Sequence, residues 1–209
     1  MKINYIDNGD SFAHIIAEYF SINGADVKMY RSDCSLETAV SGKLDMILLG
    51  PGPNGPREAG NYMELLEKYR RKIPFFGICL GFQAIMEYFG QPVVPLDDVV
   101  HGKSVPVTHN GKGIFEGIEQ DAHFARYNSL GVYLHRRKCY SIENGLRGFE
   151  VTAVSNGTIT NEKIIMAAAH ESLPVQGIQF HPDSVLSMRN DNGMRLIQNV
   201  LKVYKEIKK

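Results

Sequence analysis

The sequence has no tryptophan, only three cysteines, and no excess of charge of either sign. Its 23 basic residues equal its 23 acidic residues, whereas a dedicated nucleic-acid binder usually carries a basic excess, so we expect no nucleic-acid partner. No apolar run approaches the roughly 18 residues of a membrane helix, and we expect no membrane partner. The polar start of the chain and the absence of a CxxC pair indicate the reducing cytoplasm.

The rest of the composition is that of an ordinary globular protein, with 44% hydrophobic and 22% charged residues. A disordered chain is excluded, because disorder requires low hydrophobicity together with high net charge. No repeat, low-complexity segment or linker divides the chain. We therefore expect a single domain, residues 1–209.

The first half of the chain alternates between short apolar runs and segments with helical spacing of apolar residues. Helices are predicted at Phe12–Asn23, Tyr62–Lys72 and Leu80–Phe89. Strands are predicted at Lys2–Ile6, Asp26–Tyr30, Met46–Leu49 and Phe75–Ile78. Such alternation implies right-handed crossovers and a parallel sheet.

The second half is richer in strands and in turn signals. The predicted strands are Val93–Val94, Ser104–Val107, Phe149–Val154, Ile164–Ala169 and Val175–Phe180. Hairpin signals occur at Asn110-Gly111, Asn144-Gly145 and Asn156-Gly157, and the chain closes with a predicted helix, Met194–Lys208. The fold class expected is α/β: an open, mostly parallel sheet flanked by helices, with a smaller antiparallel extension.

The segment FFGICLGFQ runs from a predicted buried strand through Gly-x-Cys-x-Gly into a helix. This is the cysteine form of a nucleophile elbow, in which a sharp turn exposes the middle side chain, Cys79, at the edge of the sheet. The N-terminus of the helix favours a thiolate there. An ordinary buried cysteine is the alternative, and it is the preferred interpretation of Cys34 and Cys139.

A thiol nucleophile requires a base, and the base requires an orienting group. His181 directly follows the apolar strand that ends in Phe180, a usual place for functional residues in an α/β sheet. Asp183 lies two positions further on and can accept the imidazole N–H. The alternative is a surface His-Pro turn with a capping aspartate.

The segment GPGPNGP, Gly50–Pro56, directly follows the Met46–Leu49 strand. Its backbone is stiffened by proline, and the N–H of Gly52 together with that of Leu80 can form an oxyanion hole. A rigid turn without a function is the alternative. The loop is not a phosphate loop, because the Gly-Lys-Ser/Thr ending is absent.

Together, the segments GICLGFQAI, GPGPNGP and GIQFHPDSVLS resemble the class I glutamine amidotransferases in their order and spacing. The segments IDNGDSF, HGK and RYNSL are similar to the amidotransferase subunits that serve chorismate-using synthases. The resemblance covers nearly the whole chain and implies the flavodoxin-like fold of that family.

The resemblance implies that Cys79 attacks the side-chain amide of L-glutamine, with His181 as proton carrier and Asp183 orienting it. Gly52 and Leu80 would stabilise the oxyanion, and ammonia would pass to a chorismate-binding synthase subunit that makes anthranilate or 4-amino-4-deoxychorismate. No metal or cofactor is expected in this chain. The implied glutamine-binding residues are Gly52, Pro53, Asn54, Gln83, Asn128, Ser129 and Leu130.

Five positions depart from the usual family pattern: Asp183 replaces glutamate, Asn54 glycine, Gly9 tyrosine, and Phe82 and Asn128 histidine. Asp183 is one methylene shorter than glutamate, so we expect a longer or water-mediated contact to the imidazole. Asparagine tolerates a positive φ, so we expect the loop to survive at Asn54. The segments Asp7–Phe12 and His101–Lys103 are interpreted as structural or as facing the partner.

Three other functions stay open or are disfavoured. A stand-alone glutaminase or γ-glutamyl hydrolase would be active without a partner. A non-catalytic interaction module would keep the fold without the activity. A phosphoacceptor receiver-like domain, suggested by Asp7 and Asp10 near the first strand, leaves Cys79 and the second-half strands without a role.

Overall fold

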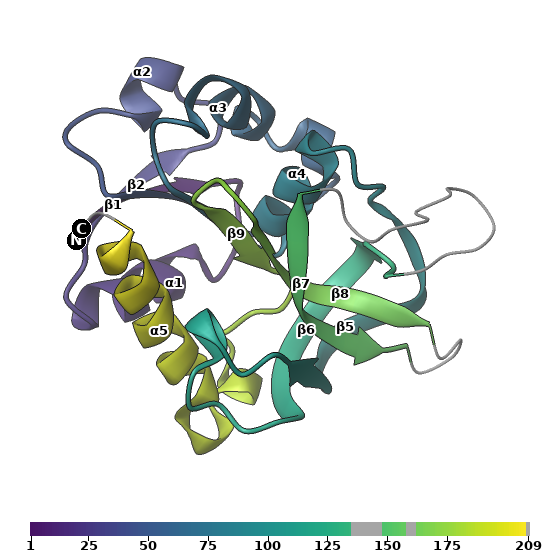
Figure 1. Ribbon diagram of the computed structural model, residues 1–209. Helices are drawn as coiled ribbons and strands as arrows, with labels where there is room; N and C mark the ends of the chain where they lie inside the picture. The colour runs from purple at the N-terminus through teal and green to yellow at the C-terminus, as the bar shows by residue number, and fades with distance from the viewer. Residues whose placement is uncertain (135–147, 158–161, 208–209) are drawn as a thin grey trace.

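The computed structural model describes residues 1–134, 148–157 and 162–207 (Figure 1). The described strands form a nine-stranded sheet in the order β2-β1-β3-β4-β9-β8-β7-β5-β6. Cys139 and the turn signal Asn144-Gly145 lie outside the described residues. The α/β fold class expected from the sequence is confirmed.

The first five strands in this order form the parallel part of the sheet, and every pair of neighbours among them is parallel. They are β1 (Lys2–Asp7), β2 (Asp26–Arg31), β3 (Met46–Leu49), β4 (Phe75–Ile78) and β9 (Val175–Ile178). At the centre, Gly77 of β4 lies directly opposite Gly177 of β9. A Cβ on Gly177 would lie 2.6 Å from the Gly77 carbonyl oxygen, so the two backbones meet without side chains between them.

Helices cover both faces of this parallel part (Figure 1). They are α1 (Ala13–Ile22), α2 (Leu36–Ala39), α3 (Tyr62–Tyr69), α4 (Leu80–Tyr88) and α5 (Asn192–Glu206). Short 3-10 turns are η1 (Pro56–Glu58), η2 (Gly113–Phe115), η3 (Val185–Ser187) and η4 (Arg189–Asp191). In β3, Met46 and Leu48 pack into the core formed with α1 and α5, whereas Ile47 and Leu49 pack into the core formed with α3 and α4. Burial on both faces explains why the parallel strands are continuous apolar runs.

The antiparallel extension consists of β5 (Val94–His109), β6 (Ala122–Gly131), β7 (Phe149–Asn156) and β8 (Lys163–His170). It joins the parallel part where β8 pairs with β9. The extension curls back, because Ala125 of β6 forms an isolated bridge with His181, just beyond β9. The last strand of the sheet therefore reaches the same edge as the end of β9.

Most predicted elements are found within one to three residues of their expected ends, but two differ. The predicted strands Val93–Val94 and Ser104–Val107 are parts of the single strand β5, whose register shifts twice. One shift includes Gly102, at φ +68, and these irregularities hide the strand alternation in the sequence. β6 was not predicted, because polar Arg126 and Asn128 occupy buried positions in it.

The hairpin signals have different outcomes. Asn110-Gly111 directly follows β5, which pairs in antiparallel fashion with β6. The connection between the two strands is not a tight hairpin turn, because it contains η2. Asn156-Gly157 ends β7 before its antiparallel neighbour β8. The short helix α2 was also missed in the sequence; Ser35 caps it by accepting a hydrogen bond from the Thr38 N–H.

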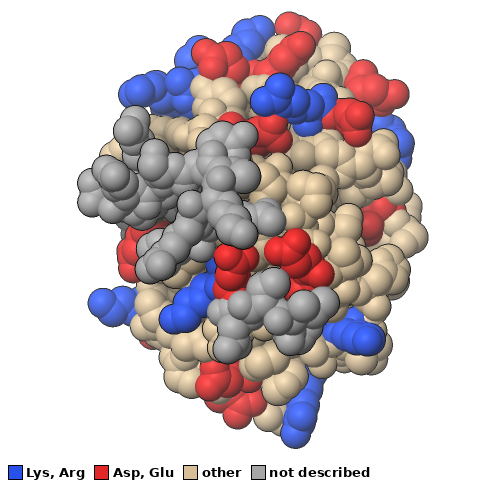
Figure 2. All heavy atoms as spheres, turned by 90° about the vertical axis from the view of Figure 1, so that its right-hand side faces the viewer, with Lys and Arg blue, Asp and Glu red and all other residues tan. Residues whose placement is uncertain are grey.

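The surface over the antiparallel extension carries charges of both signs. Figure 2 shows basic and acidic side chains interspersed on this side, without a field of one sign. This distribution agrees with the balanced composition. Within the described residues, no helix is long and apolar enough to cross a membrane.

Candidate active site

Cys79 stands in a sharp turn between β4 and α4, with φ +52 and ψ −104. A Cβ on Gly81 would lie 2.1 Å from the Leu49 carbonyl oxygen, and a Cβ on Gly77 would lie 2.5 Å from the backbone of Gly81. The turn therefore requires glycine on both sides of the cysteine. The predicted strand–turn–helix around Cys79 is confirmed, and Cys79 itself stays in a backbone conformation that stores strain at a site.

Replacing Gly81 by alanine is expected to lower the free energy of unfolding by about 3 kcal/mol, the upper end of the usual cost of overpacking. Urea denaturation of the purified chain measures this change. The matched control is Gly55→Ala, since Gly55 has φ −101 and a Cβ there would meet only Leu130 Cδ1, at 3.9 Å. The control is expected to change stability by no more than about 0.5 kcal/mol. Equal stabilities of the two variants would contradict the packing of the elbow.

His181 lies just beyond β9 and is 3% exposed. The backbone N–H of His181 donates to the Ala125 carbonyl at 2.9 Å. The imidazole ring packs edge-on against the Tyr127 ring at a centroid distance of 5.0 Å. The Tyr127 hydroxyl in turn lies 3.0 Å from Ser184 Oγ. The imidazole is therefore held from β6 as well as from its own strand.

Asp183 lies beside this imidazole, with Oδ1 3.6 Å from His181 Nδ1. The contact is longer than a direct hydrogen bond, as the shorter aspartate side chain predicts. Among the described residues, neither carboxylate oxygen of Asp183 nor His181 Nδ1 has a hydrogen-bond partner, although all three atoms are buried.

The charge state of His181 is set by opposing effects. Burial alone would lower the pKa of His181, but its interactions with Cys79 and with the Asp183 carboxylate raise this pKa well above its ordinary value. At 3.6 Å, Asp183 acts through its charge rather than through a direct hydrogen bond. An imidazolium next to a thiolate is the arrangement of an activated cysteine nucleophile.

Gln179 is a site residue that the sequence analysis missed. It is fully buried, and its Nε2 lies 3.7 Å from Cys79 Sγ, within donor range of the sulfur. Its Oε1 accepts a hydrogen bond from Gln83 Nε2 at 3.1 Å. The available signal was a glutamine within an apolar strand segment, two residues before His181.

The loop Gly50–Pro56 lies against the elbow. The Gly50 carbonyl accepts hydrogen bonds from the Gly81 N–H and from the Tyr62 hydroxyl, both at 3.1 Å. Asn54 has a φ of +68, in the left-handed region. The loop therefore adopts the positive φ that we expected asparagine to tolerate. The hydrogen bond between the Gly81 N–H and the Gly50 carbonyl therefore holds the start of the loop against the turn that contains Cys79.

The two N–H groups expected to form the oxyanion hole come from this same junction. Leu80 is the first residue of α4, where helical N–H groups have no partner within the helix. Gly52 packs closely on the neighbouring loop, since a Cβ there would lie 2.7 Å from the Asn8 carbonyl oxygen. Leu80 therefore directly follows Cys79, and Gly52 lies in the loop whose first residue, Gly50, is bonded to the elbow.

The end of β6 contacts α4 through Gln83. The Leu130 carbonyl accepts hydrogen bonds from Gln83 Nε2 at 2.9 Å and from Asn128 Nδ2 at 2.7 Å. Asn128 Oδ1 accepts from Arg126 Nε at 3.0 Å, so the Asn128 side chain is held within the protein. Ser129 is exposed. Three of the residues expected to bind glutamine, Gln83, Asn128 and Leu130, therefore meet at one carbonyl group.

The segment at the end of β1 is ordered by Asp7. Its Oδ1 accepts from the N–H groups of Gly9 and Asp10, both at 3.0 Å, and its Oδ2 pairs with Arg31 at 2.8 Å. This agrees with a structural role for the segment. Gly9 has φ +80, a conformation that disfavours the tyrosine usual in the family.

Phe12 and His101, from the two segments interpreted as structural or facing the partner, both contact the ring of Tyr127. Their ring centroids lie 6.0 and 5.3 Å from it. Since Tyr127 packs on His181, both segments lie one side chain away from His181.

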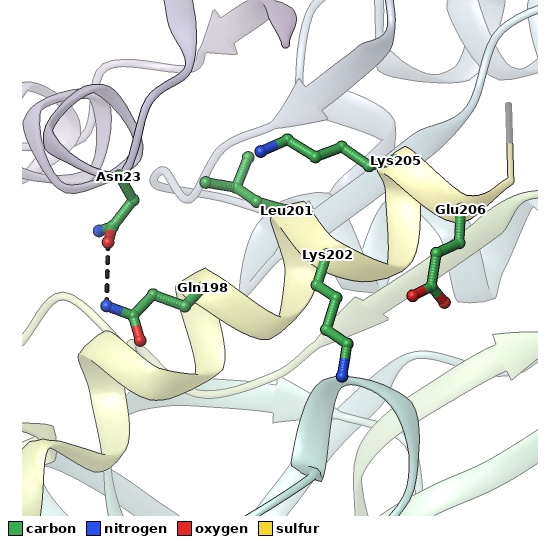
Figure 3. Close-up of a pocket in the computed structure, with 6 residues that line it drawn as sticks. All are labelled: Asn23, Gln198, Leu201, Lys202, Lys205 and Glu206. Carbon is green, nitrogen blue, oxygen red and sulfur yellow. Dashed lines mark hydrogen bonds between the residues drawn. The ribbon is translucent and has the colours of Figure 1, made fainter. Parts of the chain in front are cut away.

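Cavities elsewhere do not involve these residues. A cavity of about 340 Å³ lies between the end of α1 and α5, and Figure 3 shows its lining residues. Its lining residues are Asn23, Gln198, Leu201, Lys202, Lys205 and Glu206. No group of three or more metal-binding side chains is found in the part of the chain that the structure describes.

A family model described as glutamine amidotransferase class-I matches residues 4–202. The chain belongs to this family. The amidotransferase is 38% identical to aminodeoxychorismate synthase component 2 of Escherichia coli over 94% of its length and 97% of the relative. It is 36% identical to anthranilate synthase component 2 of Haemophilus influenzae, with 94% of each chain covered. It is also 35% identical to the aminodeoxychorismate/anthranilate synthase component 2 of Bacillus subtilis, with 96% of each covered.

Among solved structures, the amidotransferase is similar to a chain described as a GMP synthase protein from Thermoplasma acidophilum. The TM-score is 0.79 at 21% identity, with 100% of this chain and 96% of that chain covered. This likeness shows the fold alone. The family expected from the sequence motifs is thereby confirmed through the family model and the relatives.

Proposed function

We propose that this amidotransferase is the glutaminase subunit of a chorismate-aminating synthase, in which residues 1–209 act as one domain. The observation that carries the proposal is Cys79 on its strained elbow beside the buried, charge-stabilised His181. The names of the relatives, component 2 of anthranilate and aminodeoxychorismate synthases, support the partner class. A reducing cytoplasmic location fits an enzyme that depends on a free thiolate.

In the proposed reaction, the Cys79 thiolate attacks the side-chain carbonyl carbon of L-glutamine and forms a tetrahedral oxyanion. The N–H groups of Gly52 and Leu80 stabilise this oxyanion. His181 then donates its proton to the departing nitrogen, so that ammonia leaves and a γ-glutamyl thioester remains. His181 next takes a proton from water, whose oxygen attacks the thioester and releases glutamate and the thiolate. Asp183 stabilises the imidazolium in both steps.

Glutamine is proposed to lie between the loop and the end of β6. Gly52, Pro53 and Asn54 form one wall, and the other lining residues are Gln83, Asn128, Ser129 and Leu130. Both N–H donors of Gln83 have partners within the protein, Leu130 and Gln179. Gln83 therefore contacts the substrate through its Oε1, and Asn128 acts by holding the Leu130 carbonyl.

The partner subunit receives the ammonia and aminates chorismate to anthranilate or to 4-amino-4-deoxychorismate. The names of the relatives, component 2 of such synthases, support placing the chorismate site in the synthase component. The identity of the product is a property of that partner, and any magnesium requirement belongs to it as well.

The test is glutamate release from glutamine, measured with and without a chorismate-binding synthase from the same source. Strong stimulation by the synthase that depends on Cys79 is the expected result. High activity without a partner would instead support a stand-alone hydrolase. Demonstrated binding without activity would support the interaction module, with Asn54, Asn128 and Asp183 as the positions to restore to the usual family residues.

A further inference from the structure

Gln179 and Cys79 occupy equivalent places at the ends of two neighbouring parallel strands. The last register pair of β4 and β9 is Ile78 with Ile178, and Cys79 and Gln179 each come one residue later. The Cys79 N–H donates to the Ile178 carbonyl at 2.8 Å, and the Gln179 N–H donates to the Met166 carbonyl of β8, also at 2.8 Å. Both backbones are thus fixed, and the Gln179 side chain meets the sulfur, with Nε2 3.7 Å from Sγ.

The orientation of the Gln179 amide is set by Gln83. Gln83 Nε2 donates to the backbone carbonyl of Leu130 at 2.9 Å, and a carbonyl can only accept, so this contact requires the N–H side of the Gln83 amide. The second N–H of Gln83 Nε2 donates to Gln179 Oε1 at 3.1 Å. Because its oxygen is engaged there, the Gln179 amide directs Nε2 towards Cys79. The hydrogen-bond network therefore places a donor, and not an acceptor, at the sulfur.

The sulfur lies where water solvates it poorly. Cys79 is 7% exposed, and Gln179 is fully buried. A negative charge in such surroundings is costly unless donors face it. His181 also interacts with Cys79, but in the proposed reaction it gives up and regains its proton. A side-chain amide does not exchange its charge state in this way, so Gln179 stays a donor while the charge of His181 changes.

We propose that Gln179 is a catalytic residue whose Nε2–H donates to Cys79 Sγ and stabilises negative charge on the sulfur, and that Gln83 is the positioning residue that orients this donor. The inference rests on the proposed glutaminase function. In that reaction the sulfur carries charge twice, first as the attacking thiolate and again as the thiolate released when water cleaves the thioester. Gln179 therefore increases the amount of thiolate relative to thiol and assists its departure from the thioester.

The first test replaces Gln179 by methionine, which has a similar length but no donor, and measures alkylation of Cys79 by iodoacetamide in the isolated chain. Mass spectrometry separates Cys79 from the other cysteines. Losing one hydrogen bond to a charged group lowers the thiolate population, and the remaining, more nucleophilic thiolate offsets about half of that loss on a logarithmic scale. Alkylation at neutral pH is therefore expected to be about three- to tenfold slower. The ultraviolet absorbance of the thiolate is expected to fall as well.

The matched control is Gln91→Met. Gln91 is also buried, but it lies beyond the C-terminal end of α4, whereas Cys79 stands at the N-terminal end of that helix. Alkylation and thiolate absorbance are expected to stay at the parent level in this control, whatever its stability. A role of Gln179 in packing alone would change stability without changing the absorbance.

A cycle with Gln83→Met tests the orientation of the donor. This variant is expected to slow alkylation by a smaller factor than Gln179→Met, because the Gln179 amide keeps its N–H but loses its anchor. The double variant is expected to be no slower than Gln179→Met alone, since Gln83 acts on the sulfur only through Gln179.

The effect on glutamine hydrolysis is measured in the complex with the synthase. Gln179→Met is expected to lower kcat about tenfold, the effect of one lost hydrogen bond to a charged group. KM is expected to stay within about twofold of the parent value, because both polar atoms of the Gln179 amide are engaged inside the protein.

Two results would overturn the inference: a folded Gln179→Met chain that alkylates at the parent rate, or a double variant whose loss is the product of the two single losses. Slow alkylation of Gln179→Met together with a parent complex that does not hydrolyse glutamine would uphold the donor and overturn the proposed function instead. If Gln179→Met does not fold, Gln83→Met decides the question. Slower alkylation in that variant supports the inference, and alkylation at the parent rate contradicts it.

Discussion

Cys79→Ser is expected to abolish glutamine-dependent synthesis by the complex, with a loss of at least about 10³-fold, while synthesis from added ammonium salts stays at the parent rate. The serine hydroxyl is almost the same size as the thiol, so the elbow keeps its shape. It is a far weaker nucleophile at neutral pH, because His181 would have to deprotonate a much weaker acid. The measurement is product formation by the synthase with each nitrogen source.

The control for this variant is Cys34→Ser, since Cys34 is a free, half-buried cysteine in the loop before α2. Both nitrogen sources are expected to support the parent rate in this control. If Cys79→Ser lost the ammonia-dependent rate as well, in a complex that assembles normally, Cys79 would be needed for more than the release of ammonia. The proposed division of labour between the two subunits would then be wrong.

His181→Asn is expected to slow the alkylation of Cys79 by a glutamine-mimicking electrophile by about 10²- to 10⁴-fold, the usual contribution of a positioned base. In the parent, the raised pKa of His181 keeps the imidazole protonated beside Cys79. Asparagine carries no charge and takes up no proton. Mass spectrometry of the modified cysteine against time gives the rate.

The effect of His181→Asn also depends on pH. The deficit is expected to be largest near neutral pH, where the imidazolium supports the thiolate, and to shrink at alkaline pH, where hydroxide removes the proton. His14→Asn on the exposed face of α1 is the matched control and is expected to alkylate at the parent rate throughout. Equal rates for the His181 and His14 variants would show that another group is the base.

Much of the parallel part of the fold could be predicted, because its strands are buried on both faces and read as short apolar runs between helices. β3 and β4 occupy the predicted residues without any shift. The elbow could be predicted as well, since glycine on both sides of Cys79 is a local signal. Asn54, which stands where the family usually has glycine, has a φ of +68, a conformation that asparagine tolerates.

The antiparallel part was harder to predict, because its strands depend on contacts between residues that are far apart in the sequence. Arg126 is fully buried in β6, where Asp98 lies 3.5 Å from its guanidinium, and this pairing allows a charged residue in the interior. Nothing in the local pattern indicates that partner. Gln179 was missed for the same reason, since a polar side chain in an apolar strand becomes informative only when its neighbours are known.

The glycine pair at the centre of the sheet has a consequence for how this enzyme can change over evolutionary time. Cys79 and His181 follow neighbouring strands whose backbones touch at Gly77 and Gly177, and the Cys79 N–H donates directly to the Ile178 carbonyl at 2.8 Å. The spacing of the proposed nucleophile and base is therefore set by peptide groups rather than by the sizes of core side chains. Substitutions in the two hydrophobic cores can accumulate, with stabilising changes offsetting destabilising ones, while the reacting groups keep their separation. Descendants of this chain are thus free to diverge widely in the interior, provided that these two glycines remain.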